Sequence, residues 1–217
     1  MNRKEKNLRL ISESGIIAII RAESSAQLFQ VASALREGGI KIVEVTMTTP
    51  DALEVIKEIS GRFKEEILIG VGTVLDPETA RSAILAGAEF IVSPTLNKEV
   101  ITLAHRYSKV VIPGAFTPTE VLTAWEVGAD LVKVFPAGIS GPSYIKSLRG
   151  PLPQIPLVPT GGVDLDNVAS FIQAGAFAVA AGSSLVKKEF LKERNFKELT
   201  KLSKKFREAV EKAKGKK

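Results

Sequence analysis

The sequence contains no cysteine and a single histidine, His105. Without cysteine the chain cannot form disulfides, use a thiolate nucleophile or hold a metal through thiolates. One histidine cannot build a zinc site or a two-histidine iron site, which leaves an Asp/Glu magnesium site as the one metal option. His105 stands in a stretch of helical periodicity, and we interpret it as a surface or half-buried helix residue. We therefore expect no metal and no cofactor.

Long apolar runs are absent as well, since none approaches the roughly 20 residues of a membrane-spanning helix. The segment that follows Met1 lacks the apolar core and the small-residue cleavage site of a signal peptide. These absences favour a cytoplasmic protein with no membrane partner. With 217 residues, 45% of them hydrophobic and 25% charged, the chain is long enough for one domain with a sizeable core.

Aromatic residues are few, at 6% of the chain, and the net charge of +6 is unevenly distributed. Residues 187–217 contain 13 Lys or Arg and 5 Asp or Glu, a balance of +8 that leaves −2 for residues 1–186. The excess falls in the predicted basic C-terminal helix and tail, residues 190–217. Because no aromatic stacking platform and no known nucleic-acid motif accompanies it, we interpret it as a solvated helix face and expect no nucleic-acid partner.

Short apolar runs alternate with helical stretches along the whole chain. The expected strands are residues 16–20, 41–46, 67–71, 89–93, 109–112, 131–135, 157–160 and 177–181. The expected helices are residues 3–13, 25–37, 50–62, 77–86, 97–106, 118–126, 142–148, 165–174 and 195–213. Strands separated by helices pair in parallel through right-handed crossovers.

Eight such units predict an α/β fold: a single-domain (β/α)8 TIM barrel over residues 1–217, with an extra N-terminal helix within residues 1–14. The alternative is a doubly wound open sheet, which no dinucleotide-binding motif supports. In a barrel the active site lies at the carboxyl ends of the strands, so the residues at those ends are the candidates for function.

One lysine interrupts an apolar run that reads as a buried strand, Leu131-Val132-Lys133-Val134-Phe135. Alternation places Leu131, Lys133 and Phe135 on one side, so the ammonium group is buried or lies at the end of the strand. Burial lowers the pKa of a lysine, and the neutral amine attacks a carbonyl carbon to form a Schiff base. The alternatives are a lysine that extends to solvent and a lysine in a structural ion pair.

A carboxylate occupies a similar place on the second expected strand, where Ile42, Glu44 and Thr46 share a face. A carboxylate and an amine that point into one barrel mouth form a pair of general base and nucleophile. The alternative is a buried structural ion pair between Glu44 and Lys133, and such pairs stabilise proteins poorly.

Glycine-rich loops follow the last two expected strands, at Gly161-Gly162 and at Gly182-Ser183. Loops in these two positions of a barrel often hold phosphate through backbone N–H groups. We therefore predict that Gly161, Gly162, Gly182 and Ser183 bind phosphate.

In order and spacing, six segments resemble the 2-keto-3-deoxy-6-phosphogluconate / 4-hydroxy-2-oxoglutarate aldolases, class I aldolases of bacteria, over nearly the full chain. The segments are Glu44-Val45-Thr46, Gly72-Thr73-Val74, Val92-Ser93-Pro94, Ile112-Pro113-Gly114, Lys133-Val134-Phe135-Pro136 and Pro159-Thr160-Gly161-Gly162. The resemblance implies that Lys133 forms the Schiff base and that Glu44 moves protons. It also implies a small-molecule 2-keto acid as substrate and a homotrimer as the assembly.

The resemblance further implies that Thr73, with the Pro94 loop, holds the carboxylate derived from pyruvate, and that Arg21 faces the substrate. The full set of expected substrate-binding residues is Arg21, Thr48, Gly72, Thr73, Pro94, Phe135 and Thr160. The chain departs from the family at one of these positions. Many phosphogluconate-type members carry arginine at the position where this chain has Thr48. This departure concerns substrate preference.

The function predicted from the sequence is a retro-aldol lyase that releases pyruvate from a 2-keto-3-deoxy-6-phospho sugar acid or from 4-hydroxy-2-oxoglutarate. One alternative is a phosphate-binding barrel isomerase or synthase, in which Lys133 acts only through its charge. Another is a non-catalytic barrel that binds sugar phosphates.

Overall fold

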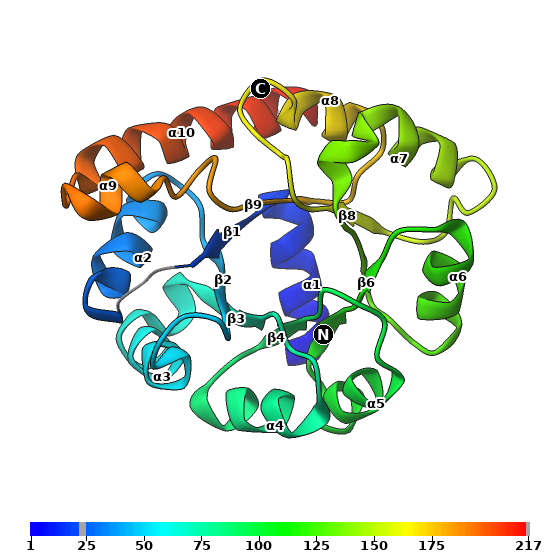
Figure 1. Ribbon diagram of the computed structural model, residues 1–217, viewed down its shortest axis with the longest axis horizontal. Helices are drawn as coiled ribbons and strands as arrows, with labels where there is room; N and C mark the ends of the chain where they lie inside the picture. Colours follow the sequence, from blue (N-terminus) through cyan, green and yellow to red (C-terminus); the bar gives the residue numbers. More distant parts are fainter. Residues whose placement is uncertain (22–24, 216–217) are drawn as a thin grey trace.

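The computed structural model describes residues 1–21 and 25–215, and parallel strands occupy its centre with helices around them (Figure 1). The strands are β1 (Ile16–Ile20), β2 (Ile42–Thr46), β3 (Leu68–Gly72), β4 (Phe90–Val92), β5 (Val110–Ile112), β6 (Gly114–Ala115), β7 (Val132–Val134), β8 (Leu157–Pro159) and β9 (Val179–Ala181). The α-helices are α1 (Arg3–Ser14), α2 (Leu28–Glu37), α3 (Ala52–Phe63), α4 (Pro77–Ala86), α5 (Lys98–Arg106), α6 (Pro118–Glu126), α7 (Gly141–Arg149), α8 (Val168–Gln173), α9 (Lys188–Lys192) and α10 (Phe196–Ala213). Short 3-10 helices are η1 (Ser25–Gln27), η2 (Lys64–Glu66) and η3 (Ala137–Ile139).

The strands pair in parallel throughout, as an α/β single-domain fold requires, but they form two sheets. The larger sheet is curled and has the order β5-β4-β3-β2-β1-β9, and the smaller has the order β6-β7-β8 (Figure 1). Pro113 separates β5 from β6, because proline has no N–H to donate to the ladder. The sequence predicted one strand, 109–112, in this region and missed β6. On the other side, a parallel bridge joins Thr160, after β8, to Ala180 of β9.

The apolar side chains form two clusters that follow the alternation of the strands. The inner cluster includes Ile42 and Leu131, with Ile11 from α1. The outer cluster lies between strands and helices and includes Val43 and Val132. The predicted faces of the second strand and of the lysine-bearing strand are therefore confirmed.

Helix ends follow the glycines of the sequence. Gly87, Gly128 and Gly175 each have a positive φ directly after a helix, where a left-handed residue ends the hydrogen bonding. Two expected helices differ in detail. Residues 25–37 form η1 and then α2, and the basic C-terminal segment contains α9 in addition to α10, while residues 216 and 217 lie outside the described residues. Among the helices of the described residues, none is long and apolar enough to cross a membrane.

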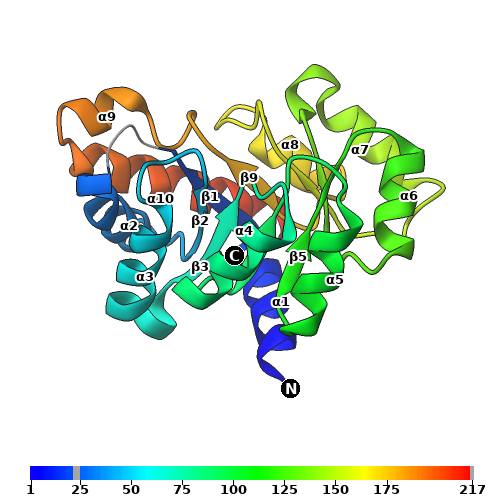
Figure 2. The ribbon, with the colours of Figure 1, turned by 60° about the horizontal axis from the view of Figure 1, so that its bottom comes forward.

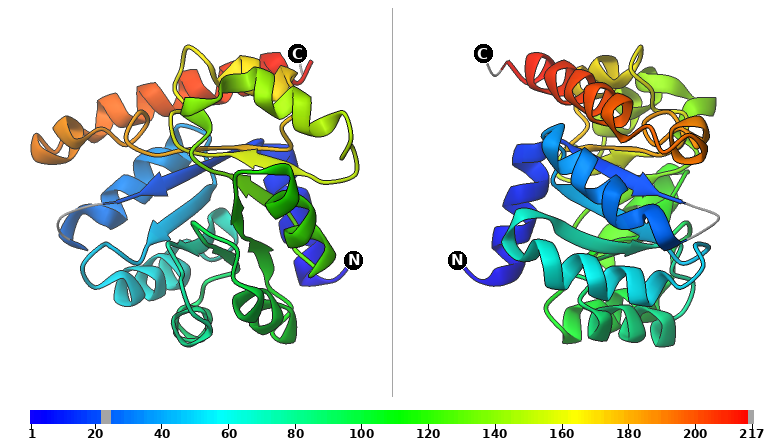
Figure 3. Two further views of the ribbon diagram at one scale, coloured as in Figure 1. Left: turned by 45° about the vertical axis from the view of Figure 1, so that its right-hand side comes forward. Right: turned by 90° about the vertical axis from the view of Figure 1, so that its left-hand side faces the viewer.

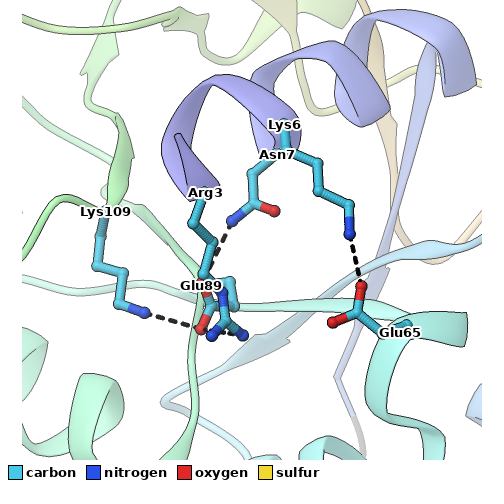
Figure 4. Close-up of polar contacts among 6 residues, drawn as sticks. All are labelled: Arg3, Lys6, Asn7, Glu65, Glu89 and Lys109. Carbon is cyan, nitrogen blue, oxygen red and sulfur yellow. Dashed lines mark hydrogen bonds and ion pairs between the residues drawn. The ribbon is translucent and has the colours of Figure 1, made fainter. Parts of the chain in front are cut away.

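The helix α1 covers the amino-terminal ends of the strands (Figures 2 and 3). Glu89, which precedes β4, accepts hydrogen bonds from Asn7 at 3.2 Å and from Lys109 at 2.8 Å, and it pairs with Arg3 at 3.0 Å (Figure 4). Ile11 of the same helix is fully buried against the inner cluster. Side chains of α1 therefore close this end of the strands, and the carboxyl ends remain for a site.

Candidate active site

Glu44 and Lys133 are buried on the inner side of the strands, with 2% and 7% of their surface exposed. Glu44 lies on β2, opposite Gly70 of β3, and Lys133 lies on β7, opposite Gly114 of β6. The two residues therefore come from different sheets, and each replaces an apolar side chain in the interior. A buried carboxylate and a buried amine in one interior are the pair that the sequence predicts.

The carboxylate of Glu44 lies against the main chain of Gly72, since a Cβ atom built on Gly72 would be 1.8 Å from Oε1 of Glu44. In the part of the chain that the structure describes, no cation lies within 4.0 Å of this carboxylate. Burial raises the pKa of Glu44 above its ordinary value, and the positive charges of Lys133 and Arg21 oppose this rise. Such a carboxyl group is suited to take up and return a proton.

The Lys133 amine has an aromatic neighbour, because Nζ lies 5.0 Å from the centroid of the Phe135 ring. The flanking residues Val132 and Val134 point to the outer cluster. The amine of Lys133 is therefore the one polar side-chain group that β7 directs into the interior. Phe135 is 39% exposed. A partly exposed ring therefore lies next to the buried amine, at the carboxyl end of β7.

Three threonine hydroxyls gather at the carboxyl end of β2. Oγ1 of the buried Thr46 lies 3.0 Å from Oγ1 of Thr48 and 3.3 Å from Oγ1 of Thr49. Thr48 itself is exposed. Thr48 lies beside Thr46, and Thr46 is two residues beyond Glu44. The uncharged hydroxyl of Thr48 is therefore at the mouth of the interior.

Thr73 follows β3 and has a φ of 60°, a left-handed conformation that is uncommon for a residue with a Cβ atom. Backbone strain of this kind clusters at functional sites. Pro94, after β4, lies on Gly114 of β6, because a Cβ atom built on Gly114 would be 2.2 Å from the Pro94 carbonyl oxygen. Gly114 also donates a hydrogen bond from its N–H to the carbonyl oxygen of Thr95 at 3.3 Å. The loop with Pro94 is thus held across the gap between the two sheets.

The two glycine-rich loops lie next to each other. Gly161 and Gly162, after β8, both have positive φ, and the N–H of Gly138 donates to the Gly161 carbonyl oxygen at 2.6 Å. Ser184, in the loop after β9, donates from Oγ to the Val163 carbonyl oxygen at 2.6 Å. This bond ties the Gly182-Ser183 loop to the Gly161-Gly162 loop, as a shared anion site would require.

The remaining predicted residues lie at the same end. Arg21 is exposed after β1, and the segment that follows it, residues 22–24, lies outside the described residues. Thr160 is buried and donates from Oγ1 to the Val158 carbonyl oxygen at 3.2 Å. One group lies on or directly after β1 to β3 and consists of Arg21, Glu44, Thr48, Gly72 and Thr73. The other lies on or directly after β7 and β8 and consists of Lys133, Phe135, Thr160, Gly161 and Gly162. Pro94 lies between the two groups, and Gly182 and Ser183 follow β9.

Sequence reasoning missed three participants at this end: Thr46, Gly114 and Gly138. Thr46 stood in a matching motif, and alternation alone places its side chain on the face of Glu44. Gly114 stood in the matching segment Ile112-Pro113-Gly114 with no role assigned to it, and no pattern singled out Gly138. Their close approaches to Pro94 and to Gly162 depend on three-dimensional contacts that no local pattern encodes.

His105 lies elsewhere, on α5. Its Nε2 is 2.6 Å from the Gly128 carbonyl oxygen and its Nδ1 is 3.2 Å from Nζ of Lys4. Across residues 1–21 and 25–215, no group of three or more His, Cys, Asp and Glu side chains is arranged to hold a metal ion.

Known proteins resemble this chain over most of its length. Residues 8–202 match the family model described as KDPG and KHG aldolase. The chain is 36% identical over 197 residues to the 2-dehydro-3-deoxy-6-phosphogalactonate aldolase of Escherichia coli (strain K12). This alignment covers 90% of this chain and 96% of that protein. It is 33% identical over 214 residues to the 2-dehydro-3-deoxy-phosphogluconate aldolase of Pseudomonas aeruginosa, with coverage of 97% and 96%.

A solved structure agrees in fold. The KDPG aldolase from Legionella pneumophila, with pyruvate captured at low pH as a covalent carbinolamine intermediate, has a TM-score of 0.85 to this chain at 29% identity. The match covers 91% of this chain and 96% of that one.

Proposed function

The chain belongs to the KDPG and KHG aldolase family, and we propose that it is a class I aldolase that uses Lys133 as the Schiff-base residue and Glu44 as the proton-transfer residue. Its substrates are 2-keto-3-deoxy-6-phosphogluconate, cleaved to pyruvate and glyceraldehyde 3-phosphate, and 4-hydroxy-2-oxoglutarate, cleaved to pyruvate and glyoxylate. The observation that carries the proposal is the burial of one amine and one carboxylate in the same interior, at the carboxyl ends of the strands.

Lys133 begins the reaction. Its neutral amine attacks the 2-keto carbon and forms a carbinolamine, which takes up a proton at its hydroxyl and loses water to give a protonated imine. Glu44 then takes the proton of the C4 hydroxyl, the C3–C4 bond breaks and its electron pair moves into the imine to form an enamine. The aldehyde leaves, the enamine carbon takes a proton back from Glu44, and water releases pyruvate from Lys133.

The polar residues around this pair bind the rest of the substrate. Thr73 and Pro94 hold the carboxylate next to the keto carbon, and Arg21 adds a positive charge at the mouth. Phe135 and Thr160 contact the carbon chain next to Lys133. The tied loops with Gly161, Gly162, Gly182 and Ser183 receive the phosphate of phosphorylated substrates, a role that their adjacency and their positive-φ glycines support.

The proposed chemistry needs no metal and no cofactor. The protonated imine withdraws electrons from the bond that breaks, which is the task of the divalent cation in metal-dependent aldolases. With one histidine and no cysteine the chain cannot build a zinc site or a two-histidine iron site, so a metal would have to be held by Asp and Glu.

We also propose that the two sheets form one closed (β/α)8 barrel in a single domain over residues 1–217. Two observations support closure: only Pro113 separates β5 from β6, and the bridge from Thr160 to Ala180 links the sheets on the other side. A homotrimer, a cytoplasmic location and the absence of nucleic-acid and membrane partners stay predictions.

The test is chemical trapping. Incubation with pyruvate and borohydride should add a reduced pyruvyl group to the peptide that contains Lys133, as read by mass spectrometry. Lys133→Met keeps the volume of the side chain, so it should fold and lose the label. The exposed lysine Lys146 of α7 provides the control, and Lys146→Met should be labelled as the wild type is. No label would favour a barrel isomerase or a non-catalytic barrel, and a label on another lysine would exclude Lys133 as the Schiff-base residue.

A further inference from the structure

The inner face of β3 carries no side chain where Glu44 lies. A Cβ atom built on Gly72 would be 1.8 Å from Oε1, 2.4 Å from Cδ and 2.7 Å from Cγ of Glu44. Real Cβ atoms essentially never approach other heavy atoms to less than 3.0 Å. The carboxylate therefore fills the space that any other residue at position 72 would take for its own side chain.

Backbone conformation does not explain this glycine. The φ of Gly72 does not lie in the left-handed region, so alanine fits its main chain without strain. The reason for glycine at position 72 is therefore space, and the group that uses the space is the side chain of Glu44.

The main chain around Gly72 is fixed on both sides. The N–H of Met47, after β2, donates to the Gly72 carbonyl oxygen at 2.9 Å, and the N–H of Val74 donates to the carbonyl oxygen of Val92 on β4 at 3.2 Å. An added methyl group would thus displace the flexible end of Glu44 and leave the strand in place. To pass from 1.8 to 3.0 Å, Oε1 must move by at least 1.2 Å.

The carboxylate cannot withdraw along β3 either. Gly70, which pairs in register with Glu44, also lacks a side chain. The Phe90 ring fills that space, since a Cβ atom on Gly70 would be 2.4 Å from the ring. Phe90 is fully buried. A methyl group on residue 72 would therefore push the carboxylate away from β3 and into the interior.

We propose that Gly72 is a positioning residue for the reaction, because its missing side chain provides the seat on β3 from which Glu44 transfers protons. This inference rests on the proposed function and replaces the expectation that Gly72 binds substrate directly. A misplacement of about 1 Å at a reacting group can cost roughly 10²-fold in rate. A Cβ atom on residue 72 meets Glu44 first, and Lys133 comes from β7, so we expect imine formation not to depend on the seat.

The experiment is a double-mutant cycle in the full-length protein. The variants are Gly72→Ala, Glu44→Ala and the double variant, with Gly61→Ala as a control, since a Cβ atom on Gly61 meets nothing within 4 Å. Three quantities are measured: kcat for aldol cleavage, deuterium exchange into the methyl group of pyruvate, and borohydride trapping of pyruvate. The alanine side chain ends at Cβ, so Glu44→Ala removes Cγ, Cδ and Oε1, the atoms that a Cβ atom on residue 72 would meet.

We expect Gly72→Ala to lower kcat and methyl exchange by about 10²-fold in the wild-type background and by less than about 3-fold in the Glu44→Ala background. Trapping at Lys133 should stay within about 3-fold of the wild type in every variant, as should all three quantities in Gly61→Ala.

Equal losses in the two backgrounds, unchanged kcat in Gly72→Ala, or a parallel loss of trapping would overturn the assignment of Gly72 alone. A wild-type protein that neither cleaves substrate nor traps pyruvate would overturn the proposed function, and this inference with it.

Discussion

Arg207, in the last helix, donates a hydrogen bond to the main-chain carbonyl oxygen of Ser14, the last residue of the first helix. Lys214 donates to the carbonyl oxygen of Ser12 in the same turn. The last turn of α1 contains no basic residue of its own, and cations next to the carboxyl end of a helix stabilise it through the helix dipole. The C-terminal helix therefore supplies the charges that end α1, and it holds α1 over the amino-terminal ends of the strands.

Arg207→Gln should lower the free energy of unfolding by about 1–2 kcal/mol, because it removes a charged hydrogen-bond donor from a carbonyl group that α1 leaves without a partner. Urea denaturation at a fixed protein concentration, followed by the fluorescence of the single tryptophan, Trp125, measures this change. Lys205→Gln removes a charge from an exposed position of the same helix and should change the free energy by less than about 0.5 kcal/mol. Equal effects of the two substitutions would mean that the contact to Ser14 contributes nothing.

Glu44→Gln should reduce turnover by about 10²–10⁴-fold, because the amide cannot take the C4 hydroxyl proton. Pyruvate trapping at Lys133 should continue, since the attack of the amine precedes that proton transfer. Steady-state kinetics and borohydride trapping on the same preparation separate the two steps. Unchanged turnover would assign the proton to another group.

The same substitution should have an effect on stability that depends on pH. Burial raises the pKa of Glu44 above its ordinary value of 4.5, so the folded protein favours the protonated form. The contribution of this group to stability is therefore complete below pH 4.5 and is lost as the pH rises through the folded pKa. Glutamine does not titrate.

We therefore expect the stability of Glu44→Gln relative to the wild type to increase from pH 4 to pH 7, as measured by urea denaturation at each pH. A relative stability that decreases over this range would mean that Lys133 and Arg21 outweigh burial and lower the pKa of Glu44.

Aldol cleavage should survive exhaustive chelation with EDTA, because the protonated imine at Lys133 performs the electrophilic work. The measurement compares kcat before and after dialysis against the chelator, with a metal-dependent aldolase as the positive control. Loss of activity that manganese or magnesium restores would contradict the imine mechanism and would point to an Asp/Glu-bound metal.

The part of the fold that the sequence predicts is the part governed by local periodicity. Alternation along β2 and β7 put Glu44 and Lys133 on the inner side, and both are buried there. Glycine after a helix marked the ends of α4 and α6, where Gly87 and Gly128 adopt positive φ. In each case the signal and the structure depend on the same few neighbouring residues.

What the sequence did not predict depends on contacts between distant residues. The larger and the smaller sheet divide at Pro113, which has no N–H, and the N–H of the next residue, Gly114, donates to the carbonyl oxygen of Thr95, outside the strands. Arg207 and Ser14 are 193 positions apart, and no periodicity relates them. Gly72 read as a substrate-binding glycine because its motif was known, whereas its contact with the Glu44 carboxylate appears only when β2 and β3 are paired.

Substitution of Thr48 tests how this chain distinguishes substrates. Its hydroxyl is exposed and lies 3.0 Å from that of Thr46, at the end of the strand that carries Glu44. An arginine in this place would present a planar, permanently charged group suited to phosphate or carboxylate, whereas threonine offers one short hydroxyl. The loops at Gly161-Gly162 and Gly182-Ser183 remain available for phosphate in either case. The wild type should therefore act on phosphorylated and unphosphorylated 2-keto acids, with a modest preference for the former.

Thr48→Arg should change the ratio of kcat/KM between 2-keto-3-deoxy-6-phosphogluconate and 4-hydroxy-2-oxoglutarate. A charge-assisted hydrogen bond contributes about 1.5–3 kcal/mol, which corresponds to roughly 10–150-fold in discrimination. Thr48→Gln, which adds length without charge, is the control and should leave the ratio within about 3-fold of the wild type. Equal effects of Arg and Gln would mean that size decides at this position. A ratio that neither substitution moves would mean that residue 48 does not face the substrate, and substrate preference would then have to arise from the loops after β8 and β9.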